Sequence, residues 1–145
     1  MVTSLKEQPL KRQPVYRNIH ITQLTSYRLP AAGWVSILHR ISGAAMFVLL
    51  PFAIWMFDTS LTSESSYEQF VSVFGFGAAG FPGWFCKLVV FALIWAYLLH
   101  FCAGLRHLWM DATHAVGLSF GRTSALVVIV LSTLVAFALG AKLFF

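Results

Sequence analysis

Three long apolar stretches constrain what this chain of 145 residues can fold into. They cover residues 31–57, 84–110 and 123–145. An α-helix needs about 20 such residues to cross the hydrocarbon core of a membrane. With 59% hydrophobic and only 10% charged residues, the chain also has too few polar groups to cover a soluble globule of its size. We therefore predict an all-α membrane protein, a single anchor domain over residues 1–145, in which three transmembrane helices form a bundle.

The distribution of charge predicts how this bundle is oriented. Residues 1–30 form a polar, basic segment, whereas the connection 58–83 contains Asp58, Glu64 and Glu68 but no Lys or Arg. The positive-inside rule then places the N-terminus on the inner side of the membrane. The net charge of +5 is accordingly interpreted as a topology signal and not as a nucleic-acid-binding surface.

The basic segment also indicates in which membrane the protein is located. The basic residues are Lys6, Lys11, Arg12, Arg17 and Arg28. Pro9 and Pro14 interrupt the amphipathic pattern that a transit peptide would need. We expect a bacterial cytoplasmic membrane protein in preference to one of the mitochondrial inner membrane. Three short helices bury little of their own surface, so we also expect a partner subunit to complete the bundle.

His100 is the main candidate for chemistry, because it lies deep in the second apolar stretch. An ionisable group at that depth costs about 2 kcal/mol or more unless it has a partner. Gly104 and His107 follow on nearly the same helix face. The imidazole can bind a haem iron, Gly104 leaves room for the ring, and Arg106 and His107 can pair with its carboxylates. Hydrogen bonding to another helix, or a proton relay, are the alternatives.

A haem at His100 would require a second polypeptide. His20, His39, His107 and His114 are all expected at or beyond the inner surface, so the chain has one deep histidine. A low-spin haem takes a further axial ligand, which another subunit would have to supply. The haem hypothesis therefore implies a hetero-oligomer.

Ser36, His39 and Arg40 form a second cluster, at helical spacing near the inner end of the first apolar stretch. Gly43 continues that face and leaves space beside it. A hydroxyl and a guanidinium beside an apolar pocket suit a quinone, because Ser36 can donate to a carbonyl oxygen and Arg40 can stabilise developing negative charge. The alternative is that Arg40 is an ordinary anchor that reaches lipid phosphates.

Other polar or reactive side chains carry less weight. Cys86 and Cys102 lie in apolar sequence without a CxxC spacing, which argues against a disulfide or a thiolate metal site. Arg106, Asp111 and His114 are expected in or beside a solvated inner loop, where their spacing assigns them no chemistry.

Two motifs resemble a known family. Residues 36–43 read Ser-Ile-Leu-His-Arg-Ile-Ser-Gly and resemble the SxLHRxSG signature of the large cytochrome b membrane-anchor subunit of succinate dehydrogenase, respiratory complex II. Residues 100–107 resemble the HxxxGxRH motif of the same family. The similarity in hydropathy extends from about residue 12 to the C-terminus, although the family's Arg-Pro pair is interrupted here as Arg12-Gln13-Pro14.

The resemblance implies specific roles. His100 would be the axial ligand of a b-type haem shared with a second small anchor subunit. His39, Arg40 and His107 would lie near the haem propionates, and Ser36, Ile37 and Arg40 would line the ubiquinone site. Succinate oxidation would take place on FAD in a flavoprotein subunit, and electrons would arrive through an iron–sulfur subunit with its clusters.

Two alternatives remain open from the sequence. The same architecture serves as the anchor of a quinol:fumarate reductase, and the direction of electron flow depends on redox potentials that the sequence does not contain. A cofactor-free structural anchor would use His100 only to hydrogen-bond between helices. A proton-coupled transporter is disfavoured because the third apolar stretch, away from its ends, offers only Ser132 and Thr133 as polar groups.

Overall fold

The computed structural model describes Thr22 and residues 27–144 of the chain. Within that part there are helices and no strand, and three helices are long and apolar enough to cross a membrane. This confirms the predicted all-α membrane fold. The predictions for the basic segment, including Lys6, Arg12, Arg17 and His20, concern residues outside the described part.

The first apolar stretch forms two helices where one, over residues 31–57, was predicted. α2 spans Ala31–Val48 and α3 spans Leu50–Leu61. Leu49, with ψ near 1°, separates them, and Pro51 follows in the first turn of α3. A proline has no N–H for the carbonyl four residues earlier and its ring crowds that turn, so the helix breaks here. Of these two helices, only α2 is a candidate membrane span.

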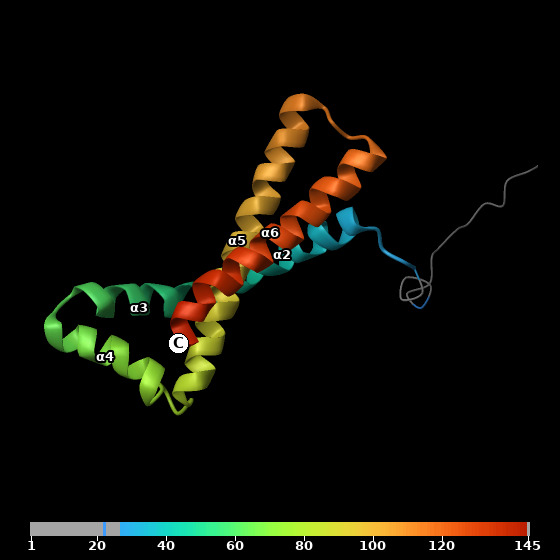
Figure 1. The fold of residues 1–145 in the computed structure, drawn as a ribbon. Helices are drawn as coiled ribbons and strands as arrows, with labels where there is room; N and C mark the ends of the chain where they lie inside the picture. Colours follow the sequence, from blue (N-terminus) through green and yellow to red (C-terminus); the bar gives the residue numbers. More distant parts are fainter. Residues whose placement is uncertain (1–21, 23–26, 145) are drawn as a thin grey trace, which may run out of the picture.

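The connection 58–83, predicted as a loop, contains a further helix. α4 spans Glu64–Gly75, and Ser63 and Ser66 cap its N-terminus reciprocally. The Ser63 hydroxyl accepts from the Ser66 N–H at 3.1 Å, and the Ser66 hydroxyl accepts from the Ser63 N–H at 2.9 Å. Such a capping box satisfies two N–H groups that the first helical turn leaves without partners. α3 and α4 run in opposite directions and project to one side of the long helices, where α4 contacts α5 (Figure 1).

The two remaining apolar stretches form the longest helices. α5 spans Gly83–Thr113 and α6 spans Leu118–Phe144, which begins earlier than the predicted residue 123. His114 ends α5 in a left-handed conformation, with φ of 53°. The chain therefore turns sharply between the two helices, and α6 returns along α5 in the opposite direction (Figure 1).

α2, α5 and α6 cross and share a small core (Figure 1). The core consists of Val35, Ala103, Ala125 and Val128. Small side chains let helix backbones approach closely, which is how helices associate in a membrane without a hydrophobic driving force. Most large apolar side chains face outward instead, for example Phe47 with 78% of its surface exposed. The outer surface of the bundle therefore suits lipid or other apolar helices.

Candidate functional site

The imidazole of His100 extends from α5 to the backbone of α2. Its Nδ1 lies 3.0 Å from the carbonyl oxygen of His39 and 3.3 Å from the hydroxyl oxygen of Ser42. The ring fits because residue 43 is glycine: a Cβ there would lie 2.9 Å from Cε1 of His100. The space beside Gly43, predicted to lie next to a quinone, is thus filled by His100.

These contacts determine which nitrogen of His100 carries the proton. A carbonyl oxygen can only accept, so the close approach to His39 makes Nδ1 the protonated nitrogen. In the neutral imidazole, Nε2 then keeps its lone pair. It has no hydrogen-bond partner among the described residues, and no side-chain nitrogen or oxygen without a partner is buried in that part of the chain. This is the usual state of a metal-binding histidine, in which one nitrogen donates to a carbonyl and the other faces the metal.

His39 and His107 lie beside His100, and we refer to these three residues as the histidine cluster. The His39 ring stacks on His100 with 4.0 Å between the ring centroids and 23° between the planes. The centroid of His107 lies 5.4 Å from that of His39. A Cβ at Gly104 would lie 4.0 Å from Nε2 of His39, so His39 occupies space that was predicted to admit a haem ring. The cluster joins both sequence motifs at one point.

The predicted quinone residues lie on α2, beside the histidine cluster. Arg40 is exposed, Ile37 is 36% exposed and Ser36 is partly buried. Neither Ser36 nor Arg40 has a side-chain hydrogen bond or ion pair with another described residue. Their polar groups are therefore available for a ligand on the side of α2 that α5 and α6 leave uncovered.

The prediction that Arg106 is solvated at the surface is wrong. Its side chain is buried between α5 and α6. Its Nε donates to the Ser124 hydroxyl at 2.9 Å, and one terminal nitrogen donates to the Gly121 carbonyl at 3.2 Å. Ser124 was not predicted as its partner, because the spacing of residues along one helix does not indicate a partner on the next. Asp111 and His114 are exposed, as expected, and Asp111 does not pair with Arg106.

Ser42 was also missed, although it lies inside the first motif. Only 3% of its surface is exposed, and its hydroxyl donates to the His39 carbonyl at 2.9 Å. That carbonyl is therefore shared by Ser42 and His100. A polar residue one turn from His39 in an apolar helix was the signal that could have identified it.

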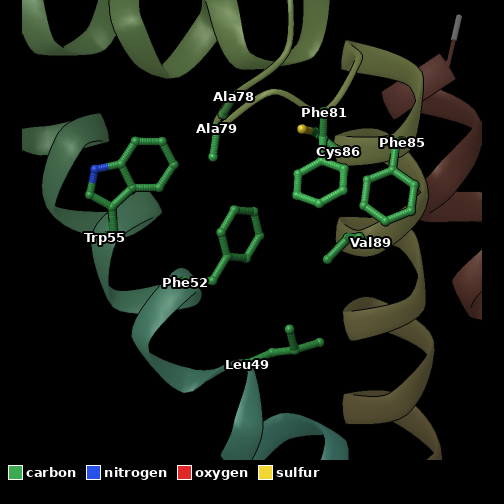
Figure 2. A pocket seen from close by; sticks show the side chains of 9 residues that line it. All are labelled: Leu49, Phe52, Trp55, Ala78, Ala79, Phe81, Phe85, Cys86 and Val89. Carbon is green, nitrogen blue, oxygen red and sulfur yellow. The ribbon is translucent and has the colours of Figure 1, made fainter.

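An apolar cavity of about 410 Å³ lies elsewhere, between α3, the turn before α5, and the first turns of α5. Figure 2 shows the rings of Phe52, Phe81 and Phe85 around it, with Val89 on the α5 side. No side chain that lines it offers an O–H, a cation or a carboxylate, and the Trp55 indole supplies the only N–H. It therefore lacks a hydroxyl and a guanidinium like those of Ser36 and Arg40, on which the prediction of a quinone site rests.

No group of three or more His, Cys, Asp or Glu side chains within the described residues is arranged to bind a metal ion. A single available imidazole can act as one axial ligand of a haem, which needs no further ligand from the same chain. Cys86 is a buried free thiol and Cys102 a partly buried one.

Comparisons with known proteins agree with both motifs. The model of a family described as "Succinate dehydrogenase/Fumarate reductase transmembrane subunit" matches residues 11–139. The chain is 33% identical to the succinate dehydrogenase cytochrome b556 subunit of Coxiella burnetii, over 75% of this chain and 82% of that protein. It is 29% identical to the cytochrome b556 subunit of Paracoccus denitrificans, over 78% and 82% of the two chains. It is also 34% identical to the cytochrome b560 subunit of Marchantia polymorpha, over 73% and 76%.

Proposed function

Because the chain belongs to the family of succinate dehydrogenase/fumarate reductase transmembrane subunits, as a cytochrome b anchor of complex II, we propose that it binds a b-type haem and helps form a ubiquinone-reduction site. The observation that carries the proposal is the state of His100. Its Nδ1 is fixed by the His39 carbonyl at 3.0 Å, and its Nε2 has no partner among the described residues. An imidazole held in this way suits an iron ligand.

The residues around His100 fit a haem in their donor chemistry. His100 would be the axial ligand, and His39, Arg40 and His107 would lie on the side of the haem propionates. Imidazole N–H groups and a guanidinium are suitable donors to carboxylates. A bound haem would supply one-electron chemistry. The chain's own contribution is to orient the His100 ring through the His39 carbonyl, Ser42 and the close approach at Gly43.

Ser36, Ile37 and Arg40 are the proposed contacts of the quinone. Ser36 and Arg40 lie one helical turn apart, so a hydroxyl donor and a guanidinium face the same region. Ser36 would donate to a carbonyl oxygen of the quinone, and Arg40 would stabilise negative charge on the ring as electrons arrive. Ile37 would contact the ring with an apolar surface. Since Arg40 and Ile37 are exposed in this chain, partner subunits would complete the site.

We propose three partner subunits, because the haem and quinone sites are incomplete in this chain. A second small membrane subunit would supply the other axial ligand. An iron–sulfur subunit would deliver electrons, and a flavoprotein subunit with FAD would oxidise succinate. The N-terminus would lie on the inner side of a bacterial cytoplasmic membrane, together with these two subunits. The positive-inside rule supports this, because segment 1–30 is basic whereas the connection 58–83 contains Asp58, Glu64 and Glu68.

The first experiment is a reduced-minus-oxidised visible spectrum of the purified native complex, with its subunits identified on a gel. We expect low-spin b-type bands together with a flavoprotein, an iron–sulfur protein and a second small hydrophobic chain. Absence of haem bands in a complex with all its subunits would reduce His100 to a residue that holds α5 against α2. The proposed quinone site at Ser36 and Arg40 would then be tested independently, by measuring quinone-reductase activity.

A fumarate reductase anchor is the second candidate, because the family's description covers both enzymes. The relatives compared above are all named as subunits of succinate dehydrogenase, which favours the first candidate. Assays of the same complex in both directions, with a ubiquinone and with a low-potential quinol, separate the two.

A further inference from the structure

A groove of about 500 Å³ runs between α5 and α6 on a face that the proposed haem and quinone sites do not use. Cys102, Leu105, Arg106 and Trp109 line it from α5 at spacings of three and four residues, which places them on one helix face. Thr123, Ser124, Val127 and Leu131 are among the residues that line it from α6. Arg106 is the only charged side chain in the lining.

The charge of Arg106 is not neutralised by the described part of the chain. Only 9% of its surface is exposed, and its two hydrogen bonds go to a hydroxyl and a carbonyl, which carry no net charge. None of the carboxylates among residues 22 and 27–144 pairs with it. A buried cation without a counter-ion is costly, so an anion beside Arg106 would be stabilised strongly.

The position of Arg106 along α5 matches the headgroup level of a membrane. It lies 23 residues after the start of the helix at Gly83, which at about 1.5 Å per residue is about 35 Å, slightly more than the ~30 Å of a hydrocarbon core. Thr123 and Ser124 on α6 lie at a similar level, since Ser124 bonds to Arg106. Leu131 on α6 is about two helical turns, or roughly 10 Å, deeper. The groove thus has a polar, cationic end and an apolar end.

The haem propionates are not suitable occupants of this groove. Arg106 follows His100 by six residues, which at about 100° per residue places the two side chains about 120° apart around α5. The polar end also has no acidic lining residue that would favour a choline or ethanolamine group. We propose that the α5–α6 groove binds an anionic phospholipid, with its phosphate at Arg106 and Thr123 and one acyl chain along Val127 and Leu131.

Lipid retention by the detergent-purified complex tests the proposal. The delipidated complex is incubated with phosphatidylglycerol or with phosphatidylcholine of the same acyl chains, and bound lipid is counted by native mass spectrometry. We expect phosphatidylglycerol to be retained with about fivefold preference, the ratio that corresponds to ~1 kcal/mol for one basic side chain near a membrane surface. Equal retention of the two lipids would overturn the proposal.

Two neighbouring positions on α6 provide a matched pair of variants. Val127 and Val130 are 55% and 54% exposed, but only Val127 lines the groove. Val127→Trp should fill the groove and abolish the preference, whereas Val130→Trp should leave it unchanged. Retention of phosphatidylglycerol by Val127→Trp would show that the lipid binds elsewhere, and loss of a partner subunit in that variant would show that a helix, and not a lipid, covers the groove.

Arg106 itself is tested with charge-conserving and charge-removing variants. Arg106→Lys should keep a preference for phosphatidylglycerol and Arg106→Gln should lose it. If either variant fails to assemble because the bond to Ser124 is lost, the Val127 and Val130 pair still decides the question. None of these variants changes His100, Ser36 or Arg40, so failure here is distinct from failure of the haem or quinone proposal.

Discussion

α5 uses different chemistry on the two sides that it presents to its neighbours. Towards α2 it presents His100, which reaches a backbone carbonyl across the close approach at Gly43. Towards α6 it presents Trp95 and Arg106, whose side chains donate hydrogen bonds to the hydroxyls of Thr133 and Ser124. Each of these two donors has a hydrogen-bond partner on α6, although the charge of Arg106 has no counter-ion among the described residues.

The α2 contact is not satisfied in the same way. Nε2 of His100 and the side chains of Ser36 and Arg40 have no partners among the described residues. In an apolar helix, polar groups without partners are costly, so their retention indicates a ligand or another subunit. From this difference between the two sides of α5, we predict that substitutions on the α2 side alter ligand binding and electron transfer. Substitutions that affect packing or hydrogen bonds between α5 and α6 should mainly alter stability.

Replacing His100 should have the largest effect. In His100→Leu the only imidazole proposed as an iron ligand is lost, so we expect the low-spin b-type bands to disappear or to change to a high-spin form. The reduced-minus-oxidised spectrum of the purified complex measures this. His107→Leu is the control, since it removes an imidazole of the same cluster without removing the ligand and should retain the low-spin bands. A low-spin spectrum unchanged in His100→Leu would show that the iron ligand lies elsewhere.

Arg40→Leu should impair quinone reduction without affecting succinate oxidation. Loss of a group that stabilises developing charge typically lowers a rate by about 10²–10³-fold. Succinate:ubiquinone reductase activity should fall by that order, while succinate oxidation with an artificial dye acceptor stays near the wild-type level. Both assays are carried out on the same preparation.

A substitution at the exposed residue next to Arg40 serves as the control. Ile41→Ala, which is next to it and whose native side chain is 58% exposed, should leave both activities unchanged. Loss of both activities together in Arg40→Leu, in a complex that retains its subunits, would place the defect before the quinone site.

The sequence was sufficient to predict the features that depend on composition and on short spacing. Long apolar runs predicted the three spanning helices. The family resemblance implied that His39, His100 and His107 surround one haem, but His39, expected nearer the inner surface than His100, stacks directly on it. The break at Leu49 was missed, even though Pro51 is a local signal, because hydropathy alone continues through residue 57.

Contacts between helices were less predictable. The partner of Arg106 is on α6, 18 residues later in the chain, and its choice of Ser124 depends on how the two helices pack. Similarly, Gly43 and Gly104 were both interpreted as space for ligands, whereas the imidazoles of His100 and His39 lie against them. Spacing along one helix indicates which residues share a face, but not which neighbour fills the space beside that face.

Gly140→Ala tests whether the α6 side mainly provides stability. A Cβ at this position would lie 2.5 Å from two ring atoms of Phe91, so the ring must move. Overpacking of this kind costs about 1–3 kcal/mol. We expect a lower midpoint of thermal dissociation of the complex, with the haem spectrum of the intact fraction unchanged. Gly75→Ala, where a Cβ meets no atom within 4 Å, is the control.

Trp95→Phe should have the smallest effect, on the same side of α5. The indole N–H donates to the Thr133 hydroxyl at 3.2 Å, and its loss should lower stability by about 1 kcal/mol. Thermal dissociation is compared with Trp84→Phe, which changes an indole that is 66% exposed. The double variant with Trp95→Phe and Thr133→Val should lose less stability than the sum of the losses in the two single variants, because both substitutions remove the same hydrogen bond. Full additivity would show that this hydrogen bond does not hold α5 to α6, and a change in quinone reduction would show that the two sides of α5 are not separate in function.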